Sequence, residues 1–176
     1  MEIFDLYDEN RIKTGKTMVR GDKTPDGYHR MGVHICIYNS DGKMLIQQRQ
    51  PFKKGWSNMW DVSVGGSAVS GDTSLSAAVR EVHEELGIEL DTAQLRRFIT
   101  IDTGRVFDDW YAVNMDIDPS ELHLQYEEVQ NAKWADIDDI KAMIDKGIFI
   151  PYHKSFIDML FHFSHNSGMR TKGDVS

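Results

Sequence analysis

The chain has 176 residues, of which 40% are hydrophobic and 27% charged, and its formal net charge at pH 7 is −8. This length predicts one domain, over residues 1–164, followed by a flexible tail at 165–176. The acidic balance excludes a groove for a nucleic-acid polymer, which needs clustered lysine and arginine. Neither a membrane span nor a signal peptide is visible, so a cytoplasmic protein without a membrane partner is expected.

The first half of the chain is rich in strand patterns. Strands are expected at residues 3–7, 12–19, 33–38, 44–48 and 60–64. The first two predict an N-terminal hairpin extension packed at the edge of a sheet. The next two flank the Asp41-Gly42 pair, which is a strong hairpin signal. The only cysteine, Cys36, excludes an intrachain disulfide and is expected to be a core residue in a reducing compartment.

The second half mixes strands with helices. Strands are expected at residues 95–100, 106–116 and 132–135, and helices between Thr73 and Gly87, at 136–146 and from Pro151 onward. The last helix carries five apolar residues, which we expect to cover a sheet face rather than to bind a partner: Phe156, Ile157, Leu160, Phe161 and Phe163. This order predicts an α/β sandwich built on a mixed sheet.

The helix between Thr73 and Gly87 carries closely spaced glutamates. Thr73 is suited to cap its start, and Gly87 to end it in the left-handed conformation. At 100° per residue, one stripe is apolar, while Glu81, Glu84 and Glu85 share a second face. Like charges at this spacing repel one another, and the macrodipole disfavours them near the C-terminal end of a helix. Two interpretations follow: a solvated acidic face, or a cation site.

A glycine-rich loop before this helix favours the cation site, because glycine lets backbone approach a ligand closely. Mg²⁺ takes a few carboxylate ligands and leaves positions for water and phosphate oxygens. A cation held between these glutamates and a diphosphate would neutralise charge on both and promote attack by water. The sequence therefore predicts hydrolysis of a small-molecule diphosphate.

The segment from Gly66 to Ile88 resembles the Nudix box: glycine, five residues, glutamate, seven residues, then Arg-Glu-aliphatic-any-Glu-Glu-any-Gly-aliphatic. Eight of the nine fixed positions match with the correct spacing, and Asp72 stands where the pattern has its first glutamate. The resemblance implies the Nudix α/β/α sandwich with a mixed sheet and dependence on Mg²⁺ or Mn²⁺. It also implies hydrolysis of a nucleoside diphosphate linked to another moiety X.

The resemblance also implies roles for individual residues. Glu81 and Glu85 match the principal metal ligands. Glu84 matches a further ligand or the residue that holds the attacking water, and Arg80 the residue that orients the glutamates. Asp72 is one methylene shorter than glutamate, so it is expected to reach a metal only through water.

Further candidates lie outside the box. Other members recruit an additional acid from a loop before the late strand, and Glu127 or Glu128 is the candidate here, with a solvated loop as the alternative. Arg49 is expected to contact a substrate phosphate or to pair with an acid. Gly65 and Gly66 are expected to let backbone approach the substrate.

Residues 2–147 are also similar to the Nudix branch that contains isopentenyl-diphosphate isomerase. Those isomerases carry a catalytic cysteine where this chain has Gly65, and a histidine metal ligand where it has Ser67. We therefore expect no isomerase activity, and structural roles for His29 and His34. A module that binds a nucleotide without cleaving it is the other alternative, and the sequence leaves the choice between monomer and homodimer open.

Overall fold

The computed structural model describes residues 2–165, so the tail expected at 165–176 lies outside them except for the backbone of its first residue. The elements are β1 (Ile3–Tyr7), β2 (Lys13–Val19), β3 (Arg30–Tyr38), β4 (Met44–Arg49), β5 (Trp60–Asp61), β6 (Val64–Ser67), α1 (Ser74–Leu86), η1 (Thr92–Gln94), β7 (Arg96–Asp102), β8 (Val106–Asn114), η2 (Pro119–Glu121), β9 (Val129–Ala135), α2 (Ile137–Asp145) and α3 (Lys154–His165). Within residues 2–165, no helix combines the length and hydropathy that a membrane-spanning segment requires.

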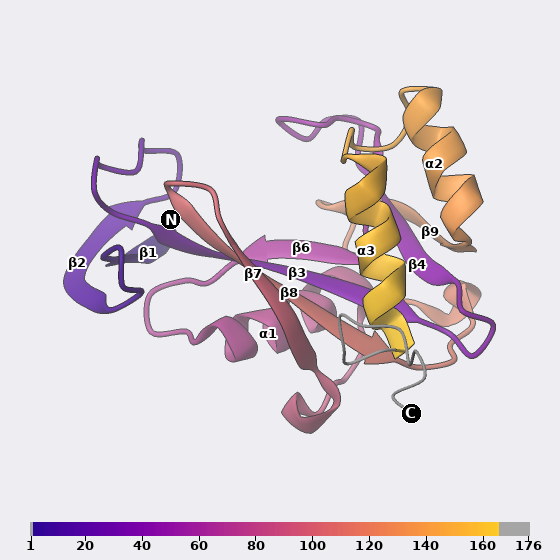
Figure 1. The fold of residues 1–176 in the computed structure, drawn as a ribbon, viewed down its shortest axis with the longest axis horizontal. Coiled ribbons are helices and arrows are strands. Elements are labelled where there is room, and N and C mark those ends of the chain that lie inside the picture. Colours follow the sequence, from indigo (N-terminus) through magenta and orange to yellow (C-terminus); the bar gives the residue numbers. More distant parts are fainter. Residues whose placement is uncertain (1, 166–176) are drawn as a thin grey trace, which may run out of the picture.

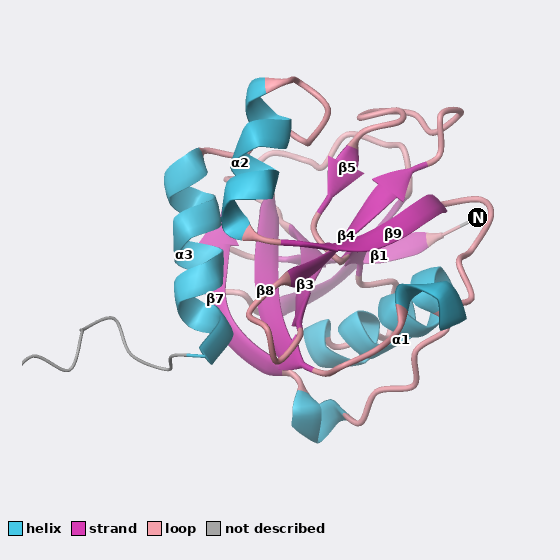
Figure 2. Ribbon diagram, turned by 90° about the vertical axis from the view of Figure 1, so that its right-hand side faces the viewer, coloured by secondary structure: helices cyan, strands magenta, loops and turns pink. Residues whose placement is uncertain are grey.

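A mixed sheet forms the middle layer (Figure 1). Its strand order is β5-β4-β3-β8-β7, with β6 paired to β3 and β9 to β4; β3 and β8 are parallel and the other pairs antiparallel. Figure 2 shows α1 on one side of this sheet and α2 with α3 on the other. The expected α/β/α sandwich is confirmed, whereas one domain over residues 1–164 stays a prediction.

Strand β3 supplies both halves of the core because alternate side chains point to opposite faces. Val33, Ile35 and Ile37 are fully buried in the cluster under α1. Cys36 and Tyr38 are fully buried in the cluster under α2 and α3, where burial raises the pKa of the Cys36 thiol to about 12. The lone cysteine is therefore a core residue, as expected.

The prediction of one strand at residues 60–64 is wrong, because the chain forms two short strands there, β5 and β6. β5 pairs with β4, whereas β6 pairs with β3. β3 and β4 diverge after a single pair, Tyr38 with Met44, so the connecting residues cross the gap between them. Ser63 Oγ fills this gap by accepting from Ile37 N–H at 2.8 Å and donating to the Leu45 carbonyl at 2.5 Å.

The last helix begins at Lys154, three residues later than expected. Trp60 accepts a hydrogen bond from Ile150 N–H and donates to the Ile148 carbonyl, and the His153 carbonyl accepts the first hydrogen bonds of the helix, from Phe156 and Ile157. The expected covering role is confirmed: Ile157 and Leu160 are fully buried against the sheet.

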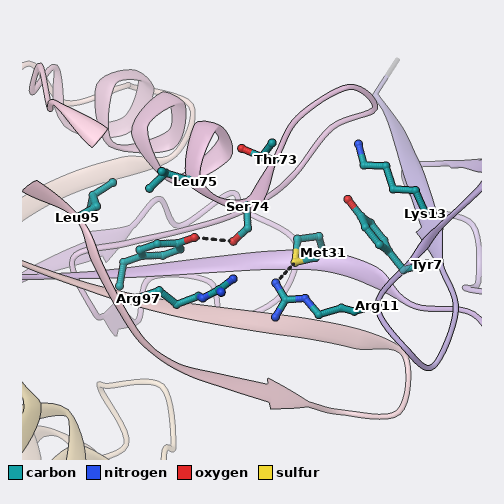
Figure 3. Close-up of a pocket in the computed structure, with 10 residues that line it drawn as sticks. Tyr7, Arg11, Lys13, Met31, Thr73, Ser74, Leu75, Leu95 and Arg97 are labelled. Atoms are coloured by element: carbon teal, nitrogen blue, oxygen red, sulfur yellow. Dashed lines mark hydrogen bonds between the residues drawn. The ribbon is translucent and has the colours of Figure 1, made fainter. Parts of the chain in front are cut away.

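The N-terminal hairpin forms its own two-stranded sheet and is fastened to the domain through Asp109. This carboxylate is fully buried on β8 and accepts from Arg11 at 2.5 Å, Thr100 at 2.6 Å and Arg97 at 3.1 Å, and also from Ser74. Arg11 and Arg97 both line a cavity of about 520 Å³ at the N-terminal end of α1. Figure 3 shows their side chains pointing toward each other. The network therefore joins the hairpin, β7, β8 and α1.

Candidate active site

Helix α1 has the ends that the sequence predicts. The Thr73 hydroxyl accepts from Ser76 N–H at 3.0 Å, and Ser76 Oγ accepts from Thr73 N–H at 2.9 Å, which forms a capping box. Gly87 ends the helix at φ 70°, where a Cβ would lie 2.7 Å from Cβ of His123. Both ends fix the rotation and length of the helix that carries the three glutamates.

The three glutamates of α1 lie in different environments. Glu85 is buried with 4% of its surface exposed, whereas the Glu84 side chain is 45% exposed and Glu81 lies between these limits. Burial raises the pKa of Glu85 well above its usual range, and the charges of Glu81 and Glu128 raise it further. A solvated acidic face does not explain a buried carboxylate at the centre of the group.

Gln47 on β4 fixes the orientation of Glu85. Its amide donates to Glu85 Oε2 at 2.9 Å. Among the described residues, Glu85 Oε1 has no hydrogen-bond partner, and this oxygen is not fully buried. Since Glu85 lines a cavity, this oxygen is open to that cavity.

Arg80 holds the other acids of the box. Its Nη1 lies 3.1 Å from Glu81 Oε1 and 3.0 Å from Glu84 Oε2. Its Nη2 donates to Asp72 Oδ2 at 3.1 Å and to the Ser67 carbonyl at 3.0 Å. The guanidinium therefore bridges the loop before α1 and two of the glutamates.

Gly66 leaves room for Glu81. The two approach so closely that a Cβ on Gly66 would lie 2.1 Å from Cδ of Glu81. Burial raises the pKa of Glu81, although Arg80 and the Ser67 N–H, which donates at 3.3 Å, oppose the shift. The glycine thus lets a helix carboxylate lie directly against a strand.

Gly66→Ala is expected to lower the free energy of unfolding by about 1–3 kcal/mol, because the added methyl overpacks the contact with Glu81. Chemical denaturation of both proteins measures this loss. Gly65→Ala is the matched control, since a Cβ there would meet only the His34 ring, at 3.3 Å from Nδ1. An equal or smaller loss in Gly66→Ala than in Gly65→Ala would contradict the expectation.

These residues surround a cavity of about 100 Å³, which we call the acidic cavity. Its lining residues are Glu2, Arg20, Gly65, Gly66, Arg80, Glu81, Glu84, Glu85, Gln125 and Glu128. Glu128 comes from the loop before β9, and Lys53 binds its carboxylate at 2.5 Å. Of the two loop acids that the sequence predicts, Glu128 and not Glu127 lines the cavity.

Two predicted site residues lie outside the acidic cavity. The Asp72 carboxylate is bound by Arg80 and also accepts from Val69 N–H at 3.3 Å. Arg49, at the end of β4, lines a different cavity on the other side of Gly65. The structure therefore brings together seven of the predicted site residues but places Asp72 and Arg49 around them.

The acidic cavity offers oxygen donors suited to a hard divalent cation. Five of its lining side chains are carboxylates, and one oxygen of buried Glu85 faces the cavity. Within residues 2–165, no three histidine, cysteine, aspartate or glutamate side chains are already grouped to hold an ion. Arg80 contacts Glu81 through Oε1 and Glu84 through Oε2, which leaves the second oxygen of each carboxylate for an ion.

Sequence reasoning missed Gln47 and Lys53, which hold Glu85 and Glu128. It also missed Arg20 and Glu2, which reach the acidic cavity from the hairpin and form an ion pair at 2.6 Å. Only Gln47 had a local signal, since it is a polar residue that follows three apolar ones in a strand.

Comparisons with known proteins agree with this architecture. A family model described as "NUDIX domain" matches residues 28–155. An uncharacterized Nudix hydrolase of Listeria monocytogenes is 43% identical over 165 residues, covering 94% of this chain and 96% of the relative. The isopentenyl-diphosphate Delta-isomerase of Shigella flexneri is 26% identical over 145 residues, covering 80% of each.

Solved structures extend the comparison. The crystal structure of a Deinococcus radiodurans protein has a TM-score of 0.75 at 25% identity, covering 94% of this chain and 100% of that one. The NUDIX domain of Shewanella oneidensis NrtR, complexed with ADP ribose, has a TM-score of 0.59 over 76% of this chain and 87% of that one. At 15% identity, this second likeness concerns the fold alone.

Proposed function

Because the chain belongs to the Nudix family of hydrolases, we propose that it cleaves the P–O–P linkage of a nucleoside diphosphate joined to another moiety X. The observation that carries this proposal is the acidic cavity, in which helix α1 and the loop before β9 bring four carboxylates against the backbone of Gly65 and Gly66. A small-molecule diphosphate is the proposed substrate, and the cytoplasm the proposed location.

The donor set fits Mg²⁺ or Mn²⁺. Glu81 and Glu85 are the proposed principal ligands, Glu84 and Glu128 the supporting ones, and Asp72 acts through water. The buried carboxylates of Glu81 and Glu85 repel each other, and a shared cation would relieve this repulsion. When bound, the cation supplies positive charge that offsets the phosphate charge and polarises the phosphorus.

The side chains of the chain itself have separate proposed roles. Gln47 keeps Glu85 in place, and Gly66 keeps the Glu81 carboxylate against β6. Glu84 and Glu128, the more accessible acids, orient the attacking water, and one of them accepts its proton. The new bond joins the water oxygen to phosphorus, while the bridging P–O bond breaks and its electron pair leaves with the departing phosphate. Arg80 orients the glutamates and lies close enough to offset part of the developing charge.

A substrate panel tests the hydrolase directly. The panel contains nucleoside diphosphates linked to different groups, including ADP-ribose, each with Mg²⁺, with Mn²⁺ or with EDTA. We expect phosphate-ester products from at least one compound with metal, and loss of that activity in EDTA. ³¹P NMR in H₂¹⁸O identifies which phosphorus is attacked. Measurable nucleotide binding without any product would instead favour the non-catalytic sensing module.

Isomerase activity is not favoured by the arrangement of the site. Gly65 provides no thiol, and the only cysteine, Cys36, is fully buried with a raised pKa. Without a thiol at the site, one of the two groups that isomerisation requires is missing. We therefore expect no dimethylallyl diphosphate from isopentenyl diphosphate, and its formation would overturn this assignment.

A further inference from the structure

A second cavity, of about 620 Å³, lies on the α3 side of the sheet. We call it the Asp61 cavity. Its lining residues are His34, Arg49, Trp56, Asp61, Ile101, Thr103, Asp108, Trp110, Ile150, Pro151, Tyr152, His153 and Phe156. This volume falls in the range of small-molecule sites, and aromatic side chains with a few polar groups are typical of their walls.

The two cavities lie on either side of Gly65. Gly65 lines the acidic cavity, and a Cβ on its other side would lie 3.3 Å from His34, which lines the Asp61 cavity. Gln47 bonds to Glu85 and is paired with Asp61 across β4 and β5. A molecule with its diphosphate at the glutamates therefore has the Asp61 cavity beside it, beyond the Gly65-Gly66 segment of β6, which carries no side chains.

Asp61 is a buried carboxylate with one oxygen unused. Its surface is 6% exposed, and Oδ1 accepts from Tyr152 Oη at 2.9 Å and from Val62 N–H at 2.8 Å. Among the described residues, Oδ2 has no hydrogen-bond partner, and this oxygen is not fully buried. Since Asp61 lines the cavity, Oδ2 is open to it. A buried acceptor of this kind is costly unless a donor satisfies it.

The walls around Asp61 suit a flat ring. His34 stacks on Trp110 at 4.1 Å between centroids, and Tyr152 and Phe156 meet Trp110 edge-on. Trp56 stands at the rim with 53% of its surface exposed. Aromatic side chains of this kind stack on nucleobases. If an apolar ligand occupied the cavity instead of a nucleobase, the Asp61 carboxylate would have no hydrogen-bond donor opposite it.

Unpartnered buried atoms gather at the same place. Within residues 2–165, the buried side-chain polar atoms without a partner include His34 Nδ1, Arg49 Nε and Trp110 Nε1, and all three residues line the Asp61 cavity. Because these atoms are fully covered, a ligand reaches them only after the side chains turn, whereas Asp61 Oδ2 is open to the cavity without such a change.

We propose that the Asp61 cavity binds the nucleobase of the substrate, and that Asp61 accepts a hydrogen bond from an exocyclic amino group of that base. The substrate class is therefore narrowed to derivatives of adenine, cytosine or guanine. This inference deepens the proposed function and rests on it for the position of the diphosphate. The ring itself is recognised by residues outside the acidic cavity.

Nucleosides test this inference, because they carry no phosphate and need no metal. Cytidine is compared with uridine, and guanosine and adenosine with inosine, by isothermal titration and tryptophan fluorescence. We expect the amino-bearing member of at least one pair to bind about tenfold more tightly, toward the lower end of what one specific base contact contributes. Discrimination below twofold in every pair would overturn the inference.

Asp61→Asn is expected to abolish this discrimination, because the amide places a donor where the base also donates. Asp158→Asn is the matched control: it removes a charge from α3, but from a side chain outside the Asp61 cavity that is 55% exposed and pairs with Lys141, so discrimination should persist. Trp56→Ala should weaken both members of a pair equally. Retained discrimination in Asp61→Asn would contradict the proposal; if that variant does not fold, the wild-type pairs decide.

Failure of this inference differs from failure of the hydrolase. Nucleoside discrimination without cleavage of any diphosphate supports the base subsite and removes the hydrolase. Cleavage of diphosphates without nucleoside discrimination supports the hydrolase and removes the base subsite. Isopentenyl diphosphate provides a further comparison. If it binds more tightly than every nucleoside, and equally well to Asp61→Asn, the cavity binds an apolar group and the proposal of a nucleobase site is wrong.

Discussion

Glu85→Gln is expected to lower kcat/KM by about 10³-fold in the presence of Mg²⁺, within the range for loss of a group acting directly in the reaction. The amide is close in size to the carboxylate and retains an oxygen that accepts from Gln47. It lacks the charge that draws a cation into the acidic cavity. Because a neutral amide costs less to bury than an unpaired carboxylate, the metal-free variant should melt no lower than the wild type. Initial rates and thermal melts measure the two effects separately.

Glu89→Gln is the matched control for this experiment. Glu89 follows α1, its side chain is 85% exposed, and it pairs with His83 outside the acidic cavity. This variant should keep the wild-type rate. Addition of Mg²⁺ should raise the melting temperature of the wild type and of Glu89→Gln, because a ligand that binds the folded state stabilises it. The increase should be smaller for Glu85→Gln, which lacks one of the proposed metal ligands. A Glu85→Gln enzyme with more than a tenth of the wild-type rate would show that the site is assigned wrongly.

Asp109→Asn is expected to lower the free energy of unfolding by about 2–3 kcal/mol at pH 7, the scale of hydrogen bonds to a charged group. The substitution removes the charge that holds Arg11 and Arg97 together, although both guanidinium groups keep part of their contact with water. The hairpin should loosen first, since Arg11 is its link to β8. Urea denaturation measures the total loss, and hydrogen exchange of residues 3–19 measures the local one.

The Asp109 contribution should depend on pH with a definite sign. Burial alone would raise the pKa of Asp109, but hydrogen bonds from Arg11, Ser74 and Thr100 outweigh burial and lower it. The stabilisation is therefore fully present above the unfolded pKa, about 3.9, and is lost as the pH falls through the lower folded value. The difference between wild type and Asp109→Asn should be constant above about pH 5 and shrink below about pH 4.

Asp108→Asn provides the comparison at the adjacent position of β8. Its side chain is partly exposed, and the ion-pairing side chain nearest to it is His34 at 3.7 Å. The effect of this substitution on the free energy of unfolding at pH 7 should be smaller. Equal losses in the two variants would indicate that Asp109 is no special anchor of the hairpin.

Local patterns were sufficient to predict helix α1. The capping residues Thr73 and Gly87 act within one turn of the helix ends, and both occupy the predicted cap positions. The relative placement of Glu81, Glu84 and Glu85 follows from helical periodicity alone. The mixed sheet and its two flanking layers were also predictable, because strand and helix patterns appear in that order along the chain.

Several strand details depended on longer contacts. The split between β5 and β6 arises because β3 and β4 diverge, which no pattern in residues 60–64 reports. The chain before α3 also depends on a distant contact, since residues 148 and 150 pair with Trp60 before the helix begins at Lys154. Local propensity favours a strand or a helix in these segments, but their partners determine where each begins.

The sequence by itself determined the fold class, the ends of α1 and the gathering of acids on one face of that helix, because caps and periodicity act between neighbours in the chain. Only the tertiary structure decided that Glu85 is the buried one of the three glutamates and that Glu128 lines the same cavity. It also decided that Asp61 lines a second cavity, on the other side of Gly65. Gln47 reaches Glu85 from 38 residues away, and Lys53 reaches Glu128 from 75. Burial and charge at the site depend on these distant partners, and their spacing in the chain carries no periodic signal.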